Sequence, residues 1–305
     1  MSASPRSKSS VETMREAVTG PGSRRLQRLY FDTVDEIDEL DSFHHVLGNL
    51  TRDAYNTAAA KISKTADWES GYDGGDLHDD AISQIGIDPY NVSLHVGLMV
   101  VSRAVTVLET LTVEVMEAIL SGPVDELVYP NGKQWTHDMA DDLYWRVLLR
   151  PLRPWSGESM KAIARLRNLY VHAYGVHRFV EDAEDLAALL HKVTRADRGP
   201  TPDEAGLGLH GDATFFDLDT TYHPKEGLRG GFGVGPEIQM VLSPLATHRL
   251  LGLIRQRAIE ILDASSYGTV KDLTERIDQW VAKHLDRNKA ADAAAASEAP
   301  SPGTA

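Results

Sequence analysis

The chain has 305 residues with 31 Lys or Arg against 45 Asp or Glu, a formal net charge of −14. It is long enough for one or two domains and too acidic for a general nucleic-acid coat protein. The absence of cysteine excludes disulfides, thiolate zinc sites and cysteine nucleophiles.

The N-terminal 23 residues are small and polar, so we expect residues 1–23 to be disordered. They lack the apolar core of a secretory signal. The longest apolar stretch, near Val92–Val101, is too short to span a bilayer. These features predict a cytoplasmic protein that does not associate with membranes.

Helical spacing of apolar residues dominates the first two thirds of the chain. From Arg24 to Lys64 it predicts one or two amphipathic helices. Residues 65–90 form a Gly- and Asp-rich connection. Val92–Leu120 is apolar on most faces and predicts a central helix, which we expect to end at residues 121–123.

Two further helices are predicted before residue 196. Trp135–Leu149 forms a shorter helix that ends ahead of two prolines. Ser156 is the expected N-cap of the next helix, which bends near Gly175 and resumes to about Arg195. Together, residues 24–196 are predicted to form one helical domain.

The pattern changes after a Pro- and Gly-rich linker at residues 197–212. Ala213–Tyr222 and Glu237–Leu242 read as two strands, separated by a Gly-rich loop. Helices are expected over Ala246–Ala264 and Leu273–Leu285. We therefore predict a β-hairpin plus helices over residues 213–287, followed by a disordered tail over residues 288–305.

A basic segment interrupts the acidic chain at residues 146–178, where seven Lys or Arg face a single acid, Glu158. Such a local excess of positive charge favours a polyanion even when the total charge repels it. A solvated arginine-rich loop and helix face would look the same. The basic residues are Arg146, Arg150, Arg153, Lys161, Arg165, Arg167 and Arg178.

Within this segment, Arg167-Asn168-Leu169-Tyr170-Val171-His172-Ala173-Tyr174 combines a phosphate-binding guanidinium with a proton-transferring imidazole. Asn168 and His172 are four residues apart and share a helix face. Arg167 lies about 140° round the helix from His172. One helix therefore does not aim both groups at one point, which favours a two-fold site built from two chains.

This octet resembles the signature of the HEPN family of all-helical ribonucleases, Arg, four to six residues, then His, with Asn commonly after the Arg. The longer form that ends in Tyr174 is similar to that of HEPN toxins paired with nucleotidyltransferase antitoxins. The small strand-containing C-terminal extension is predicted from the strand pattern after residue 212. The resemblance implies a mainly α fold, an antiparallel HEPN-like helical bundle over roughly residues 25–196. In sequence it covers only the octet.

The resemblance also implies a reaction, a site and partners. His172 would transfer the proton, Arg167 would hold the scissile phosphate, and Asn168 would orient one of them. The expected reaction is transesterification of RNA by its 2′-hydroxyl in a homodimer, without metal or cofactor, in defence, toxin or stress responses. An antitoxin or regulatory partner is implied for the toxin form. The expected RNA-contacting residues are Tyr174, Arg165, Lys161, Arg153, Arg150 and Arg178.

Two alternatives stay open. The first is a non-catalytic HEPN-like module for dimerisation or RNA binding, which the acidic total charge favours. The second is an HD-type metal-dependent phosphohydrolase that uses histidines and aspartates such as His44, His45, His137 and Asp141.

Weaker patterns carry simpler interpretations. The acidic segment from Asp73 to Asp80 lacks the ligand spacing of a calcium loop, and the glycines from Gly227 to Gly235 lack the strand and helix that flank a phosphate loop. Arg103 and Glu109 interrupt the apolar central helix, and either is a candidate to support the octet from a neighbouring helix.

Overall fold

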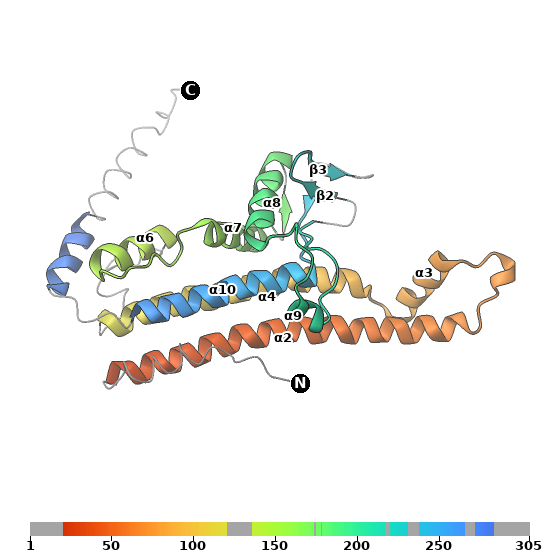
Figure 1. Ribbon diagram of the computed structural model, residues 1–305, viewed down its shortest axis with the longest axis horizontal. Helices are drawn as coiled ribbons and strands as arrows, with labels where there is room; N and C mark the ends of the chain where they lie inside the picture. The colour runs from red at the N-terminus through yellow and green to blue at the C-terminus, as the bar shows by residue number, and fades with distance from the viewer. Residues whose placement is uncertain are drawn as a thin grey trace, which may run out of the picture. The chain divides into compact units, whose positions relative to one another are not determined.

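The computed structural model describes residues 21–120, 136–173, 175–177, 179–216, 220–230, 238–265 and 272–283. Most of these residues are helical and the strands are short, so the protein is mainly α with a small strand-containing part (Figure 1). This confirms the expected fold class. The predicted tail and nearly all of the predicted N-terminal disordered segment lie outside the described residues.

The chain divides into two compact units. The first unit takes residues Met1–Phe31, Thr110–Ser156 and Ile259–Ala305, and the second takes Asp32–Glu109 and Gly157–Ala258. Each unit therefore combines stretches that are distant in sequence. This division does not follow the boundaries at residues 196 and 212 that we expected from composition.

Long helices form the core of the second unit. Helices α2 (Pro21–Ser63), α4 (Pro89–Leu120) and α10 (Pro244–Ser265) contribute to both units, and within the second they lie side by side (Figure 1). Apolar residues of α4, such as Leu98, Val101 and Val105, are at most 1% exposed. The sequence correctly placed α4 and α10, and a single helix occupies the first amphipathic stretch.

Charged and polar pairs join these helices. Arg103 Nε of α4 donates to Glu36 of α2 at 3.0 Å. Arg255 Nε of α10 donates to Asp38 of α2 at 2.8 Å. Both pairs are partly exposed, so burial of the apolar faces rather than these pairs supplies most of the stabilisation.

One of these helices, over Asn91–Leu120, is long and apolar enough to cross a membrane by length and composition. This differs from our expectation of a stretch too short to span. Its most apolar window is 61% buried inside the protein, as is usual for a core helix.

The first unit contains the shorter helix that was expected over residues 135–149. Thr136 caps α6 (His137–Asp142) by accepting from the Met139 amide, and a π-helical turn, η2 (Leu143–Val147), follows. The Tyr144 hydroxyl donates to the Thr112 carbonyl at 3.3 Å, and the Trp280 indole donates to Asp142 at 3.0 Å. Residues 273–283 are helical, in agreement with the prediction as far as they are described.

The helix that carries the octet, α7 (Glu158–Ala173), is shorter than predicted. Ser156 is not its N-cap, because its hydroxyl donates to Asp141 instead. The chain leaves α7 through Gly175, whose φ of +84° is in the left-handed region. A Cβ there would lie 3.1 Å from Leu98 and 3.0 Å from Gln239, so the close approach also requires glycine.

Gly175 replaces the expected helix bend with a complete break. The two-residue strand β1 (Val176–His177) follows it, and α8 (Val180–Thr194) resumes the helix. Strand β1 pairs antiparallel with β4 (Ile238–Gln239). The end of α7 is thereby fixed against a segment more than sixty residues away in sequence, where the Met240 amide also donates to the Gly175 carbonyl at 2.8 Å.

The strands differ in detail from the two that were predicted. The hairpin is formed by β2 (Thr220–His223) and β3 (Gly227–Gly230), so part of the predicted Gly-rich loop is a strand. Strand β4, residues 238–239, pairs with β1 and is not part of the hairpin. Phe216 and Met240 form an isolated antiparallel β-bridge.

Two segments predicted as connections contain helices. Helix α3 (Gly74–Ile85) starts at Asp73, which forms a capping box with Asp76. Helix α9 (Pro202–Gly206) starts at Thr201, which forms another with Glu204. In both, a reciprocal cap begins a helix within a Gly- or Pro-rich segment.

Candidate functional site

Helix α7 carries the first seven residues of the octet, Arg167 to Ala173, on its last two turns, within the second unit. Asn168 and His172 are exposed, whereas Arg167 is partly buried. Leu166, one residue before Arg167, is 1% exposed and anchors this side of the helix in the core. The same helix therefore exposes the imidazole to solvent and directs the guanidinium toward Glu109 of α4.

Arg167 is held by two oxygen atoms from different helices. Its Nη2 donates to Glu109 Oε2 of α4 at 3.2 Å, and its Nη1 donates to Asn168 Oδ1 at 3.0 Å. The side chains of Arg167 and Glu109 are 26% and 28% exposed. Of the two α4 residues considered from sequence, Glu109 thus contacts the octet, and Arg103 pairs with Glu36 instead.

These two contacts leave part of the guanidinium available. A guanidinium has five N–H donors, and the contacts to Glu109 and Asn168 use two of them. Arg167 Nε is buried and has no hydrogen-bond partner among the described residues. Five other buried side-chain atoms of the described residues also lack a hydrogen-bond partner, so the donors available to a ligand are the remaining N–H groups on Nη1 and Nη2 of Arg167.

His172 makes no hydrogen bond to another residue that the structure describes. It lies in the last turn of α7. The two remaining positions, Tyr174 and Arg178, lie outside the described residues.

The basic segment is divided between the units. Lys161 and Arg165 are exposed on α7 with the octet, whereas Arg150 and Arg153 belong to the first unit. The Arg153 guanidinium lies 5.2 Å from the centroid of the Trp145 ring, an arrangement typical of a cation–π contact.

Arg150 is removed from the candidate RNA contacts. It is 4% exposed, and this burial lowers the pKa of its guanidinium. A side chain enclosed in this way does not reach a polyanion at the surface. Arg150 follows the left-handed residue Leu149, and its amide donates to the Tyr144 carbonyl at 2.9 Å, which turns it inward.

The histidines and aspartates of the metal-dependent alternative have structural contacts instead. The buried His44 ring donates Nε2–H to the Ser93 carbonyl at 2.9 Å. Asp141 accepts from the Trp155 amide at 2.7 Å, and the His137 ring stacks on Trp155. The described residues contain no group of three or more His, Asp or Glu placed to hold a metal ion.

The acidic and Gly-rich segments have simple roles where they are described. Asp73 and Asp76 cap α3, and the Asp80 carboxylate accepts from the Tyr72 hydroxyl at 2.9 Å. Gly227 starts strand β3 with a φ of +73°. The remaining glycines from Gly231 to Gly235 lie outside the described residues.

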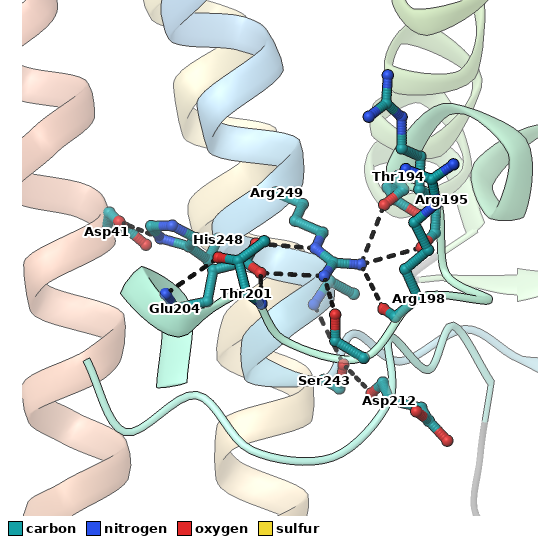
Figure 2. A network of polar contacts seen from close by, with 12 residues as sticks. Asp41, Thr194, Arg195, Arg198, Thr201, Glu204, Asp212, Ser243, His248 and Arg249 are labelled. Carbon is teal, nitrogen blue, oxygen red and sulfur yellow. Dashed lines mark hydrogen bonds and ion pairs between the residues drawn. The ribbon is translucent and has the colours of Figure 1, made fainter. Parts of the chain in front are cut away.

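Sequence reasoning missed a polar network around Arg249 of α10 (Figure 2). Arg249 Nε and Nη2 donate to the two oxygens of Glu204 at 2.9 and 3.0 Å. The next residue back, His248, contacts Asp41 of α2 at 2.7 Å, and this hydrogen bond raises the pKa of the imidazole. The Thr201-to-Glu204 capping box is visible in the sequence, but its partner in α10 is not.

Comparison with known protein families, with curated proteins and with solved structures found no match to this chain.

Proposed function

We propose that this protein is a metal-independent endoribonuclease whose site is built around the octet in a homodimer. The observation that supports the proposal is the arrangement of the octet. Arg167 donates hydrogen bonds to Glu109 of α4 and to Asn168, and His172 is exposed one turn beyond Asn168. Glu109 fixes the direction of the guanidinium, and its unused N–H groups can bind a phosphate.

In this reaction the 2′-oxygen of RNA attacks the adjacent phosphorus, and the bond from phosphorus to the 5′-oxygen breaks. His172 takes the 2′-hydroxyl proton or gives a proton to the 5′-oxygen. Arg167 stabilises the charge that develops on the phosphate oxygens. The products carry 2′,3′-cyclic phosphate and 5′-hydroxyl ends.

The homodimer follows from the divergence of the two groups. Arg167 is held on the α4 side of α7, about 140° from His172, so a second copy would supply the missing group. Exposed apolar side chains lie within the octet and shortly after it: Val171 at 49%, Phe179 at 65% and Val180 at 37%. Exposed apolar residues of this kind are suited to a contact between copies. We propose that the dimer acts on cytoplasmic RNA.

Cleavage of single-stranded RNA in EDTA tests the proposal. Arg167→Ala and His172→Ala should each lower the rate by about 10²–10³-fold. Matched controls are Arg103→Ala, which breaks an Arg–Glu pair of α4 outside the octet, and His95→Ala, which removes an exposed histidine of α4. Equal activity in all variants, or activity that chelation abolishes, would refute the proposal.

Mixing the two inactive variants tests whether the site is shared. If one copy supplies Arg167 and the other His172, a mixed dimer retains one intact site of two. Because half of the dimers are mixed at random, activity should return to about a quarter of the wild-type value. A mixture as inactive as its components would show that each chain uses its own pair.

The second candidate is a non-catalytic helical module that binds RNA or dimerises. The Glu109 carboxylate, which offsets the charge of Arg167, favours it. Glu109→Gln separates the two. In the nuclease it loosens Arg167 and slows cleavage, while in the binding module it frees a positive charge and tightens RNA binding without any cleavage.

A further inference from the structure

A cavity of about 180 Å³ lies in the second unit, away from the octet. It is lined by α2, the start of α4, the segment that follows α9 and the first residue of α10. Ser93 at the cavity and Glu109 at the octet are 16 residues apart on α4, which corresponds to about 24 Å of helix. The cavity is therefore separate from the proposed RNA site.

Donor side chains line this cavity. Arg52, His45 and Asn49 come from α2, where the Asn49 amide donates to the His45 ring Nε2 at 3.0 Å, and His210 comes from the segment after α9. Arg52 and His210 are exposed and have no hydrogen bond or ion pair with any other described residue. No Asp or Glu of the described chain lines the cavity. In a protein with more acids than bases, this cavity offers an anion an unpaired arginine and no lining carboxylate, which favours binding of an anion.

The walls of the cavity are fixed before any ligand arrives. His44 joins α2 to the Ser93 carbonyl at 2.9 Å, and its burial lowers the pKa of the ring, which keeps it neutral. On the other side, Arg249 holds Glu204 (Figure 2), and the Leu209 amide donates to the Glu204 carbonyl at 3.1 Å. The segment that presents His210 is thereby anchored to α10.

We propose that this cavity binds the phosphate group of a small phosphate ester. The forked donors of Arg52 match phosphate oxygens. Arg52 of α2 and His210 of the segment after α9 line different walls of the cavity, and donors on separate walls suit a tetrahedral oxyanion better than a planar carboxylate. The volume equals that of roughly six water molecules, enough for a phosphate with a small organic group. The proposal is independent of RNA cleavage.

Calorimetric titration of the full chain with ribose 5-phosphate, inorganic phosphate and acetate tests this site. The affinity should fall in that order. Arg52→Gln should weaken binding of ribose 5-phosphate by about tenfold or more, because it removes a charge-assisted contact. Lys61→Gln is the matched control, since it removes one positive charge from α2 outside the cavity and should leave the affinity unchanged.

His210→Ala provides a second variant and should also weaken binding, since its side chain is exposed and has no described partner to lose. Three results would overturn the proposal: no heat of binding at about 10 mM ester, equal weakening by Lys61→Gln and Arg52→Gln, or acetate binding as tightly as the ester. Inorganic phosphate binding as tightly as the ester would overturn the assignment to an ester.

Discussion

Replacing Arg249 by methionine should destabilise the second unit strongly, because this one side chain joins three parts of it. Besides Glu204, the guanidinium donates to the carbonyls of Thr194, Arg195 and Arg198 at 3.2, 3.1 and 3.0 Å. These carbonyls lie at the end of α8 and just beyond it, where backbone acceptors lack helical partners. Methionine keeps the apolar stem and removes every donor.

The magnitude follows from the burial of the pair. Arg249 and Glu204 are each only 12% exposed, and the Arg249 hydrogen bond lowers the pKa of Glu204 to about 2. A shift of that size corresponds to roughly 3 kcal/mol of stabilisation of the charged carboxylate. Removing one partner of such a pair commonly costs about 3–5 kcal/mol, since the other charge stays buried.

Urea denaturation of the wild type, Arg249→Met and a matched control measures this loss. The control is Arg255→Met, which breaks the exposed pair with Asp38 on the same helix and should cost less than about 1 kcal/mol. Adding Glu204→Gln to Arg249→Met should recover part of the stability, because no uncompensated charge is left. Equal losses for the Arg249 and Arg255 variants would refute this account.

The pH dependence of the same network has a definite sign. The lowered pKa of Glu204 means that its contribution is complete above the unfolded value, near 4.3, and is lost as the pH falls toward about 2. The urea midpoints of wild type and Arg249→Met should therefore converge in that acidic range. A constant difference there would contradict the assignment to Glu204.

Two further predictions concern α10 and the residues against it. The hydrogen bond to Asp41 raises the pKa of His248 in the folded protein. The contribution of His248 to stability is therefore complete below about pH 6.5 and is lost as the pH rises through the higher folded pKa. Over that pH range the urea midpoint of the wild type should fall, whereas that of His248→Gln should not. Gly97→Ala should destabilise the protein by about 1–3 kcal/mol, because the added Cβ would lie 2.5 Å from Thr247 Oγ1. Gly252→Ala should stabilise it by about 0.5–1 kcal/mol, because the added Cβ would meet nothing within 4 Å. Thermal melts that rank the two alanine variants in the opposite order would contradict this packing.

The long helices could be predicted because their apolar residues repeat with the helical period over many turns. The predicted helix Ala246–Ala264 lies within α10, Pro244–Ser265, and the predicted start of the central helix is three residues from that of α4. Each of these segments buries a broad face, so the same residues set the pattern and the fold.

The sequence did not predict short elements whose formation depends on a distant pairing partner or on a helix cap. Strand β1 has two residues and exists because β4, more than sixty residues later, pairs with it. Helix α3 lies in an acidic segment whose composition suggests a loop, yet the Asp73 capping box begins a helix there. Local composition does not report either contact, since one is long-range and the other depends on a single reciprocal hydrogen-bond pair.

The candidate site shows the same division between local and distant information. Helical geometry places Asn168 and His172 on one face of the helix and places Arg167 on a different face from His172. The sequence alone was enough to predict this arrangement. The sequence could not show which residue of α4 supports Arg167, because Arg103 and Glu109 both interrupt the apolar pattern. Only the packing of α7 against α4 pairs Arg167 with Glu109.

That pairing limits how the octet can act. A guanidinium that already contacts a carboxylate contributes little net charge at long range, so Arg167 alone does not explain attraction of RNA to an acidic protein. In the proposed nuclease, attraction would depend on the exposed cations of the same helix, Lys161 and Arg165, while Arg167 would act at contact distance through donors oriented by Glu109. The proposal therefore gives recruitment and phosphate contact to different residues of α7. It predicts that the salt dependence of RNA binding changes more on replacing Lys161 and Arg165 than on replacing Arg167.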